Sequence, residues 1–260
     1  MSASTTTLRI TPKPAVLGAV VEDIDLGEPV APEVVAEIRS ALNRYQVLFF
    51  PEQGITAEQQ VRLGRQFGTL HTHAVLGSRE DLPEVVVFDT ALEAPVAEMW
   101  HSDVSCSAEP PLGSILQLVI VPDHGGNTHW ASMTAAYDAL DDDTKARIDG
   151  LRAFHQSWWQ PFEEGTHPVV RTHPETGRRS IYVNRLFAKH IVDMDEPESR
   201  ELLHMLCKHA TSEEFVVTHE WHAGDIAFWD NRVTQHRVDN DFGDARRRGE
   251  RVTINGDVPR

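Results

Sequence analysis

Three stretches of the chain place apolar residues three or four positions apart, the period of one face of a helix. This spacing predicts helices over residues 32–45, 56–67 and 198–209. The first begins with Pro32, which suits a first helical turn, and the second with Thr56, a residue type that caps helices. Each predicted helix is apolar on one side only, so each needs a surface to pack against.

Short runs rich in β-branched and aromatic residues follow one another through most of the remaining chain. They cover residues 47–50, 85–88, 115–121, 151–155, 180–183, 215–218, 226–229 and 252–254. Turn-forming residues separate these runs, which is typical of strands. Strands and helices do not alternate strictly, so the pattern disfavours a doubly wound parallel sheet. We expect one domain over residues 1–260, mainly β with flanking helices: a β-sandwich or jelly roll.

Composition and charge limit the partners of this domain. The 260 residues are 40% hydrophobic and 25% charged, an ordinary globular profile. The 24 basic and 40 acidic residues give a net charge of −16, which repels phosphate backbones and anionic lipid. The apolar runs are far too short to cross a bilayer. We therefore expect neither nucleic acid nor a membrane as a partner.

The cysteines and the N-terminus indicate the compartment. Only two cysteines are present, Cys106 and Cys207, and they lie far apart in the sequence. This argues against a disulfide framework and a cysteine zinc module, and it suits a reducing environment. No basic segment followed by an apolar one opens the chain, so no signal peptide is visible. We expect a cytoplasmic protein.

A His-x-Asp triplet, His101-Ser102-Asp103, is the first candidate for chemistry. With 14 histidines in the chain, such a triplet is expected by chance, so it is weak evidence alone. Its place between two β-rich segments adds weight, because residues i and i+2 of a strand point to the same face and reach one ion. Spacing alone favours a surface histidine and aspartate near a turn over a metal site.

A second cluster follows the predicted strand 226–229, which enters a polar turn and leads to His236 on the outgoing strand. Together with His101 and Asp103, His236 would complete a set of two histidines and one carboxylate, the ligand set of non-haem iron oxygenases. Three ligands on one face leave positions for a bidentate 2-oxo acid and dioxygen.

Arginines stand downstream of His236. Arg247 and Arg251, four residues apart, precede the predicted strand 252–254. An arginine in this position can pair with the far carboxylate of a 2-oxo acid through a bidentate fork. The run 246–248 also looks like a solvated loop, so at least one of its three arginines is expected to be structural or exposed.

In this order the motifs resemble the taurine dioxygenase and phenoxyacetate dioxygenase family of Fe(II)/2-oxoglutarate-dependent oxygenases. The resemblance runs from Leu48 to the end of the chain. Its signatures are Phe67-Gly68-x-Leu70-His71, Trp100-His101-Ser102-Asp103-Val104, Gly125-Gly126-Asn127-Thr128, Tyr182-Val183-Asn184-Arg185, and Trp229-Asp230-Asn231-Arg232 with His236, Arg247 and Arg251. The resemblance implies a double-stranded β-helix (jelly roll).

The resemblance also implies roles for single residues. His101, Asp103 and His236 would be the metal ligands and the catalytic centre. Thr128 and Arg247 would hold the two carboxylates of 2-oxoglutarate. Arg251 would lie at the active site beside this co-substrate and meet an anionic group of the substrate.

The substrate side of the site is less specific. His73 resembles a substrate-contacting histidine, although a loop histidine with satisfied hydrogen bonds fits as well, and Phe187 either shapes the pocket or packs in the core. A taurine-specific enzyme carries a tyrosine and an asparagine where this chain has Leu76 and Ala97. Both changes replace polar substrate contacts with apolar ones, so taurine itself fits poorly.

The implied activity is hydroxylation of a C–H bond in a small anionic substrate, namely an alkyl sulfate, a sulfonate or a carboxylic acid. Fe(II), 2-oxoglutarate and O2 would be required, and succinate and CO2 released. The alternatives are a zinc hydrolase or cupin-type isomerase with the same ligands, which has no use for Thr128 and Arg247, and a non-catalytic binding domain of the same shape. Relatives suggest a homo-oligomer, either a dimer or a tetramer.

Overall fold

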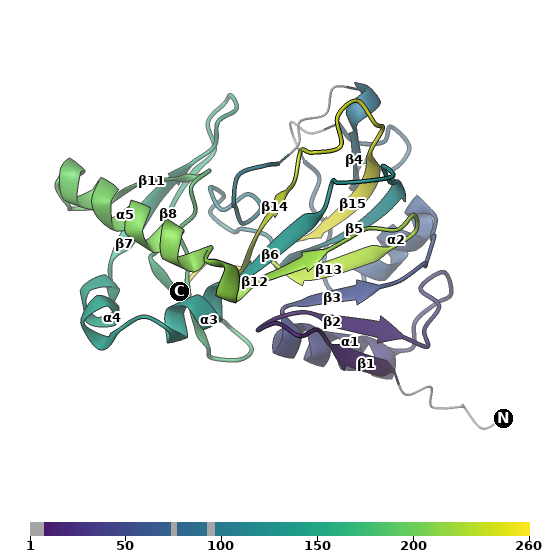
Figure 1. The fold of residues 1–260 in the computed structure, drawn as a ribbon, viewed down its shortest axis with the longest axis horizontal. Coiled ribbons are helices and arrows are strands. Elements are labelled where there is room, and N and C mark those ends of the chain that lie inside the picture. Colours follow the sequence, from purple (N-terminus) through teal and green to yellow (C-terminus); the bar gives the residue numbers. More distant parts are fainter. Residues whose placement is uncertain (1–7, 74–76, 93–96) are drawn as a thin grey trace.

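The computed structural model describes residues 8–73, 77–92 and 97–260, and its largest element is a seven-stranded sheet (Figure 1). The strand order is β1-β2-β3-β13-β5-β15-β4, with β2 and β3 parallel and the other neighbours antiparallel. The strands are β1 (Arg9–Pro12), β2 (Ala19–Glu22), β3 (Val47–Phe50), β4 (Val85–Asp89), β5 (Gly113–Ile120), β13 (Ile226–Asp230) and β15 (Arg248–Ile254). Strands from both ends of the sequence thus meet in one sheet.

A smaller antiparallel sheet faces one side of the large sheet. Its order is β12-β6-β14, and its strands are β6 (Thr128–Ser132), β12 (Val216–His219) and β14 (Thr234–Val238). Buried side chains from both sheets form one hydrophobic cluster between them: Val47, Phe49, Leu116, Leu118, Trp130, Val217 and Trp229. The two sheets therefore enclose a common interior.

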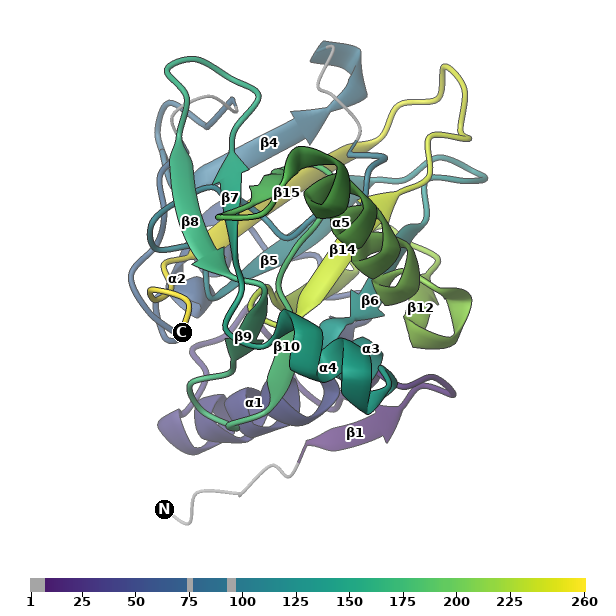
Figure 2. The same cartoon turned by 90° about the vertical axis from the view of Figure 1, so that its left-hand side faces the viewer.

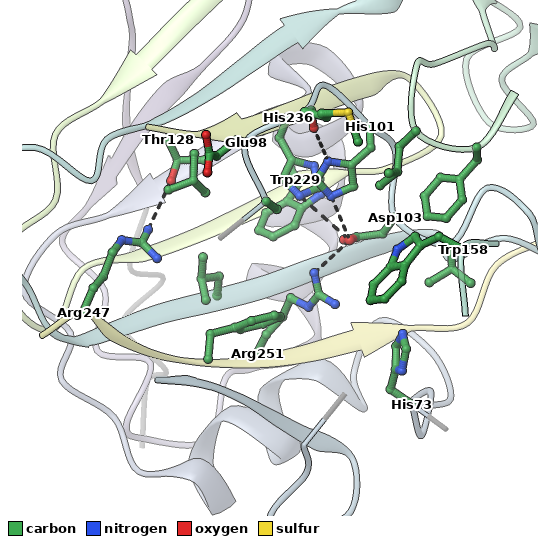
Figure 3. A pocket seen from close by; sticks show the side chains of 18 of the residues that line it. His73, Glu98, His101, Asp103, Thr128, Trp158, Trp229, His236, Arg247 and Arg251 are labelled. Carbon is green, nitrogen blue, oxygen red and sulfur yellow. Dashed lines mark hydrogen bonds and ion pairs between the residues drawn. The ribbon is translucent and has the colours of Figure 1, made fainter. Parts of the chain in front are cut away.

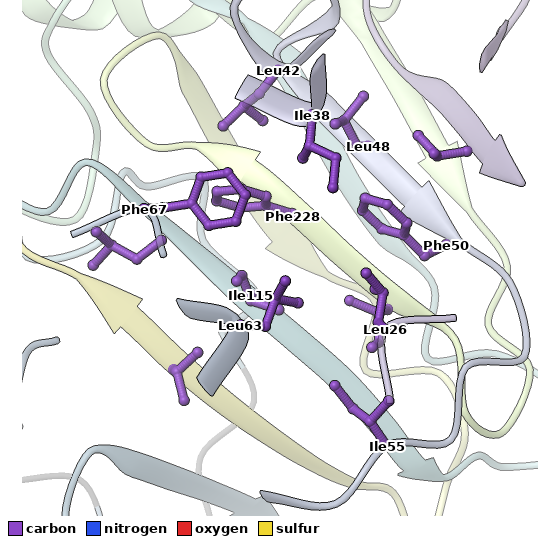
Figure 4. Packing of buried hydrophobic residues seen from close by; sticks show 14 of the residues in the cluster. Leu26, Ile38, Leu42, Leu48, Phe50, Ile55, Leu63, Phe67, Ile115 and Phe228 are labelled. Carbon is purple, nitrogen blue, oxygen red and sulfur yellow. The ribbon is translucent and has the colours of Figure 1, made fainter. Parts of the chain in front are cut away.

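Two helices, α1 (Pro32–Tyr45) and α2 (Ala57–Gly64), cover the other face of the large sheet. Their apolar residues pack against those of the sheet, as Figure 4 shows for Ile38, Leu63 and Phe228. Strand alternation separates the two faces: Leu48 and Phe50 point to the helices, while Val47 and Phe49 point to the small sheet.

The remaining elements form a layer beside the small sheet, and α5 lies across the front of this layer in Figure 2. A three-stranded sheet has the order β11-β7-β8, and a two-stranded sheet pairs β9 with β10. The elements are α3 (Met133–Asp138), α4 (Asp142–Ile148), α5 (Glu196–Ala210), β7 (Arg152–Gln156), β8 (Glu164–Pro168), β9 (Val170–Thr172), β10 (Arg179–Ile181) and β11 (Ala188–Ile191), with short 3-10 turns η1 (Thr90–Leu92) and η2 (Glu213–Phe215). The apolar side of α5 packs into a second core, as its spacing predicted.

The mainly β fold with flanking helices is confirmed, and the three predicted helices correspond to α1, α2 and α5. α2 begins after the predicted cap Thr56, whose side chain accepts a hydrogen bond from the Gln59 amide, but it ends at Gly64 instead of Phe67. There the chain turns, and Phe67 packs edge-on against Phe228 with ring centroids 4.9 Å apart.

Every predicted strand overlaps an observed one, but β1, β2, β6, β8, β9 and β11 and the short helices α3 and α4 were not predicted. The sequences of β8, Glu-Gly-Thr-His-Pro, and β11, Ala-Lys-His-Ile, contain too few apolar residues to show a period of two. No helix among the described residues is long and apolar enough to cross a membrane.

Candidate metal centre and adjoining cavity

His101, Asp103 and His236 meet in the interior between the two sheets, and all three are buried (Figure 3). One potential ligand atom of each lies within 4.8 Å of the others. Asp103 Oδ1 is 3.7 Å from His101 Nε2 and 3.9 Å from His236 Nε2. Within the described part of the chain, no other group of three His, Cys, Asp or Glu residues comes together in this way.

The backbone brings the two histidines together. His236 lies on β14, and His101 forms an isolated antiparallel bridge with it, with N–H···O distances of 3.1 and 2.8 Å. Asp103 is not on a strand but in the turn that follows, so the expected strand arrangement of His101 and Asp103 is wrong. The chain reverses direction at Val104, whose φ is +46°, and this turn places the Asp103 carboxylate next to the two histidines.

The protonation states suit a metal dication. The Nδ1 of His101 is 2.8 Å from the Met99 carbonyl, to which it donates, and this leaves the Nε2 lone pair directed at the cluster. Burial lowers the pKa of both histidines, that of His236 to about 3. Burial alone would raise the pKa of Asp103, but the Arg251 guanidinium, the two neighbouring histidines and the Ser114 hydroxyl together outweigh it and hold this pKa well below its usual range. Two neutral imidazoles and one carboxylate are therefore available at neutral pH, which is what divalent iron requires of its ligands.

Groups around Asp103 hold it in place. Arg251 Nη1 donates to Oδ1 at 2.8 Å, and Ser114 Oγ donates to Oδ2 at 3.1 Å. The Asn231 side chain bonds to both the N–H and the carbonyl of Asp103. Ser114 and Asn231 were not predicted as site residues, and only the position of Asn231 inside the Trp229–Arg232 signature pointed to it.

The three residues line a cavity of about 580 Å³. Thr128 and Arg247 lie on one side of them, and His73 and Trp158 lie on the other (Figure 3). The first side is polar, whereas the second is bounded by large apolar groups: Val104, Trp158, Trp159, Leu186 and Phe187. The cavity therefore offers two different environments next to one potential metal site.

Arg247 and Thr128 form the polar end. Arg247 is 8% exposed, and no carboxylate of the described residues forms an ion pair with it. Burial lowers the pKa of its guanidinium to about 10, so it still carries its charge at neutral pH. Its Nη2 lies 3.5 Å from Thr128 Oγ1, which already accepts a hydrogen bond from Trp221 Nε1 at 2.9 Å. The threonine hydroxyl is thus left to donate, and the pair suits a carboxylate ligand.

Arg251 lies between the polar and apolar ends. It projects from β15 on the face opposite Val252 and Ile254, which pack under the helices. Its guanidinium lies over the Phe88 ring at 4.9 Å, and its buried Nε has no hydrogen-bond partner among the described residues. Arg246, by contrast, is exposed and paired with Asp89, as expected for one member of the arginine run.

The structure places the predicted substrate residues as follows. His73 lines the cavity, its ring lies 5.8 Å from that of Trp159, and burial with the nearby Arg251 lowers its pKa to about 4. Phe187 and Ala97 also line the cavity, whereas Leu76 lies outside the described residues. The cavity thus brings together every predicted site residue that the structure describes.

Comparison with known proteins gives consistent matches over nearly the whole chain. Residues 7–253 match the model of the "Taurine catabolism dioxygenase TauD, TfdA family". An alpha-ketoglutarate-dependent 2,4-dichlorophenoxyacetate dioxygenase of Cupriavidus pinatubonensis is 33% identical, covering 92% of this chain and 94% of its own. An alkylsulfatase of Acinetobacter baylyi is 31% identical over 93% of this chain and 83% of its own.

A solved structure shows the same fold. The crystal structure of a taurine dioxygenase from Burkholderia xenovorans superimposes with a TM-score of 0.90 at 41% identity, covering 97% of this chain and 90% of that one. This match confirms the double-stranded β-helix (jelly roll), of which the two facing sheets form the two sides.

Proposed function

Because this chain belongs to the taurine catabolism dioxygenase TauD, TfdA family, we propose that His101, Asp103 and His236 hold the iron of a 2-oxoglutarate-dependent dioxygenase. The enzyme uses Fe(II), 2-oxoglutarate (alpha-ketoglutarate) and O2, and it hydroxylates a C–H bond of a small anionic substrate with release of succinate and CO2. The zinc or cupin-type alternative is not supported, since the matching family and the phenoxyacetate relative are named as dioxygenases. The observation that carries the residue assignment is a buried set of two neutral histidines and one carboxylate, beside an arginine with no ion-pair partner among the described residues.

The bound iron supplies the activation of O2 and the oxidation of the C–H bond. The residues of the chain would hold this iron from one side. Ser114 fixes Oδ2 of Asp103, and the Met99 carbonyl fixes the tautomer of His101. Such hydrogen bonds to the ligands set their orientation and basicity.

Thr128 and Arg247 are proposed to bind 2-oxoglutarate. Arg247 would form a bidentate pair with one carboxylate. Because its Nη2 lies 3.5 Å from Thr128 Oγ1, the Thr128 hydroxyl would donate a hydrogen bond to this same carboxylate, and not to the other one as the resemblance implied. A buried cation without a counter-ion pays a desolvation cost that a carboxylate relieves. The other end of a dicarboxylate held here would face the ligand set, because Thr128, Arg247 and the two histidines line the same cavity.

Arg251 is proposed to receive the anionic group of the substrate, with neutral His73 nearby. Both lie where the ligand set meets the apolar side of the cavity. Trp158, Trp159 and Phe187 would then surround the rest of the substrate and exclude water from it. The substrate class that fits is an anion with an apolar body: a sulfate ester, a sulfonate or a carboxylic acid. Its relatives named above act on such anions.

The test is an anaerobic titration of the apoprotein with Fe(II) and 2-oxoglutarate, followed by visible absorption. Bidentate binding of 2-oxoglutarate to Fe(II) gives a weak charge-transfer band, and candidate anions that bind next to it shift this band. We expect the band in the wild type and in His129→Ala, whose histidine bonds to Asp239 outside the cavity, but not in His236→Ala. Tight Fe(II) binding without any band would reject the assignment of the 2-oxoglutarate site.

We also propose that residues 1–260 form one domain, that the protein is cytoplasmic, and that it assembles as a homodimer or homotetramer. The family match spans residues 7–253, which supports the first statement. Both cysteines are free and buried, which suits a reducing compartment. Size-exclusion chromatography with light scattering tests the oligomeric state.

A further inference from the structure

The side chain of Asn231 forms hydrogen bonds with both the N–H and the carbonyl of Asp103. Its Oδ1 accepts a hydrogen bond from the Asp103 N–H at 2.7 Å, and its Nδ2 donates to the Asp103 carbonyl at 2.9 Å. The same Nδ2 donates to the Pro111 carbonyl at 3.2 Å. Asn231 is fully buried, so water does not compete for these bonds.

These hydrogen bonds hold a stretch of backbone that is in an unfavourable conformation. Val104, the residue after Asp103, has a φ of +46°, and a β-branched residue adopts this left-handed region only at a cost in free energy. The surrounding structure must therefore impose the turn. The direction of the Asp103 carboxylate depends on this turn, since the carboxylate leaves the chain immediately before Val104.

Asn231 is itself firmly held. It lies in the turn between β13 and β14, where Asp230 and Arg232 form a buried ion pair at 2.7 Å and the Asn231 N–H donates to the Leu112 carbonyl at 2.9 Å. The strand that leaves this turn carries His236. One amide side chain thus connects the segment of the carboxylate to the segment of the second histidine.

We propose that Asn231 is a positioning residue for the metal site, which holds the strained Asp103–Val104 turn so that the carboxylate stays within reach of His101 and His236. The proposal rests on the proposed function, because it takes these three residues as metal ligands. Asn231 touches neither metal nor substrate and acts through the backbone of Asp103. Loss of a group that orients a ligand weakens metal binding by about 10- to 100-fold.

Mn(II) affinity of the metal-free protein, measured by titration with EPR detection of free Mn(II), tests the proposal without requiring turnover. We expect Asn231→Ala to bind Mn(II) about 10- to 100-fold more weakly than the wild type while still unfolding cooperatively. Gln117→Ala is the matched control. The Gln117 side chain forms the same pair of hydrogen bonds with the N–H and the carbonyl of Ile55, at 2.8 and 2.9 Å. It does so on the helix-covered face of the sheet, away from the cavity. We expect its Mn(II) affinity to stay within about twofold of the wild type.

The outcomes are distinguishable. An Asn231→Ala protein that binds Mn(II) as tightly as the wild type would overturn the proposal, and so would a Gln117→Ala protein that loses as much affinity, because general loosening of the fold would then explain both. If Asn231→Ala does not fold, Asn231→Ser, which keeps one polar group, is judged by the same comparison. A folded wild type that binds no Mn(II) would contradict the proposed metal site itself.

Discussion

Arg247 is a buried cation beside Thr128. Among the described residues, its guanidinium makes only long polar contacts, to the Gly126 carbonyl at 3.3 Å and to Thr128 Oγ1 at 3.5 Å. Desolvation of the guanidinium opposes folding in the absence of a ligand, as the lowered pKa indicates. In the proposed role of Arg247, the free energy of 2-oxoglutarate binding would include the relief of this cost. Arg247 would then contribute to co-substrate binding at the expense of stability.

For Arg247→Met we expect 2-oxoglutarate affinity to fall at least about 100-fold, since a buried charged partner of the carboxylate is lost. The melting temperature of the ligand-free protein should stay equal or rise, because the unpaired charge is removed. Calorimetric scans with and without 2-oxoglutarate check both statements. A clear fall in the melting temperature of the ligand-free variant would show that Arg247 has a structural role instead.

Arg251 donates a hydrogen bond to Asp103, and its buried Nε has no partner within the part of the chain that the structure describes. In Arg251→Met we expect the KM of the anionic substrate to rise by about 10-fold or more, while 2-oxoglutarate affinity changes little because Arg247 remains. Kinetics are measured at saturating Fe(II), so that an effect on Asp103 does not obscure the result. An unchanged KM would refute the role of Arg251 in substrate binding.

At the residue scale, the sequence predicted the identity of His101, Asp103, His236, Thr128 and Arg247, since each belongs to a recognisable motif. It did not predict how Asp103 reaches the histidines. The left-handed Val104 and the Asn231 side chain produce that geometry, and neither follows from local propensity. Ser114 also escaped prediction, because its contact with Asp103 exists only once the β5 strand is placed in the sheet.

At the element scale, the loop between β7 and β8 forms one wall of the cavity. Trp158 in this loop lines the cavity although its side chain is 57% exposed, and its ring lies edge-on to Trp159 at 5.6 Å. Hydrogen bonds between Ser157 and Glu163 close the loop at its base. A large indole exposed in this position is a surface that an apolar substrate would cover.

We expect Trp158→Ala to raise the KM about 10-fold for anions with a bulky apolar body, and to change it little for short-chain anions that do not reach the loop. The change in kcat should be small, because Trp158 is remote from the polar end of the cavity. Phe162→Ala is the control, since Phe162 is 50% exposed in the same loop but does not line the cavity. Equal effects in both variants would indicate a general role of the loop.

The elements that the sequence predicted best are those with a clear hydrophobic signal. The continuous apolar run of β3 and the apolar side of α1 both indicated burial. In the structure α1 packs in the helix-side core, and β3 contributes Leu48 and Phe50 to that core and Val47 and Phe49 to the interior between the sheets. The short strand β6 carries polar residues, and β8 carries polar residues together with Gly and Pro. Both pair because the neighbouring strands supply hydrogen-bond partners. Tertiary context, absent from any local window, decides such strands.

At the scale of the whole molecule, buried histidines link stability to pH. Burial lowers the pKa of His155 to about 3 and of His167 to about 4, well below the unfolded value of about 6.5. Between these values the unfolded chain binds protons that the folded protein does not. Stability is therefore greatest above pH 6.5 and falls as the pH drops, by about 1.4 kcal/mol per pH unit for each histidine.

Urea unfolding of the metal-free protein at pH 7.5, 6.0 and 5.0 checks this dependence. We expect the free energy of unfolding to fall by several kcal/mol over the range. In His155→Asn the slope below pH 6 should be shallower by about 1.4 kcal/mol per pH unit. An identical slope in the variant would mean that His155 is protonated in the folded state.

The architecture of the whole molecule was predicted from the combination of many short strands, three amphipathic helices and a family resemblance. What the sequence did not reveal is which strands pair with each other. β13 lies between β3 and β5, although long stretches of chain separate the three strands in sequence. Pairings over such distances depend on the packing of the complete chain.

The bridge between His101 and His236 also has a consequence for biosynthesis. These two proposed ligands are more than half the chain apart, and Arg247 and Arg251 follow the second of them. A nascent chain still on the ribosome before His236 has emerged carries only His101 and Asp103, and it lacks β14 and β15 as well. With these ligands, we expect iron to be held by all three residues only after β14 has paired with β6 and β15 has entered the sheet between β5 and β4, so that complete metal loading follows the synthesis of the C-terminal strands.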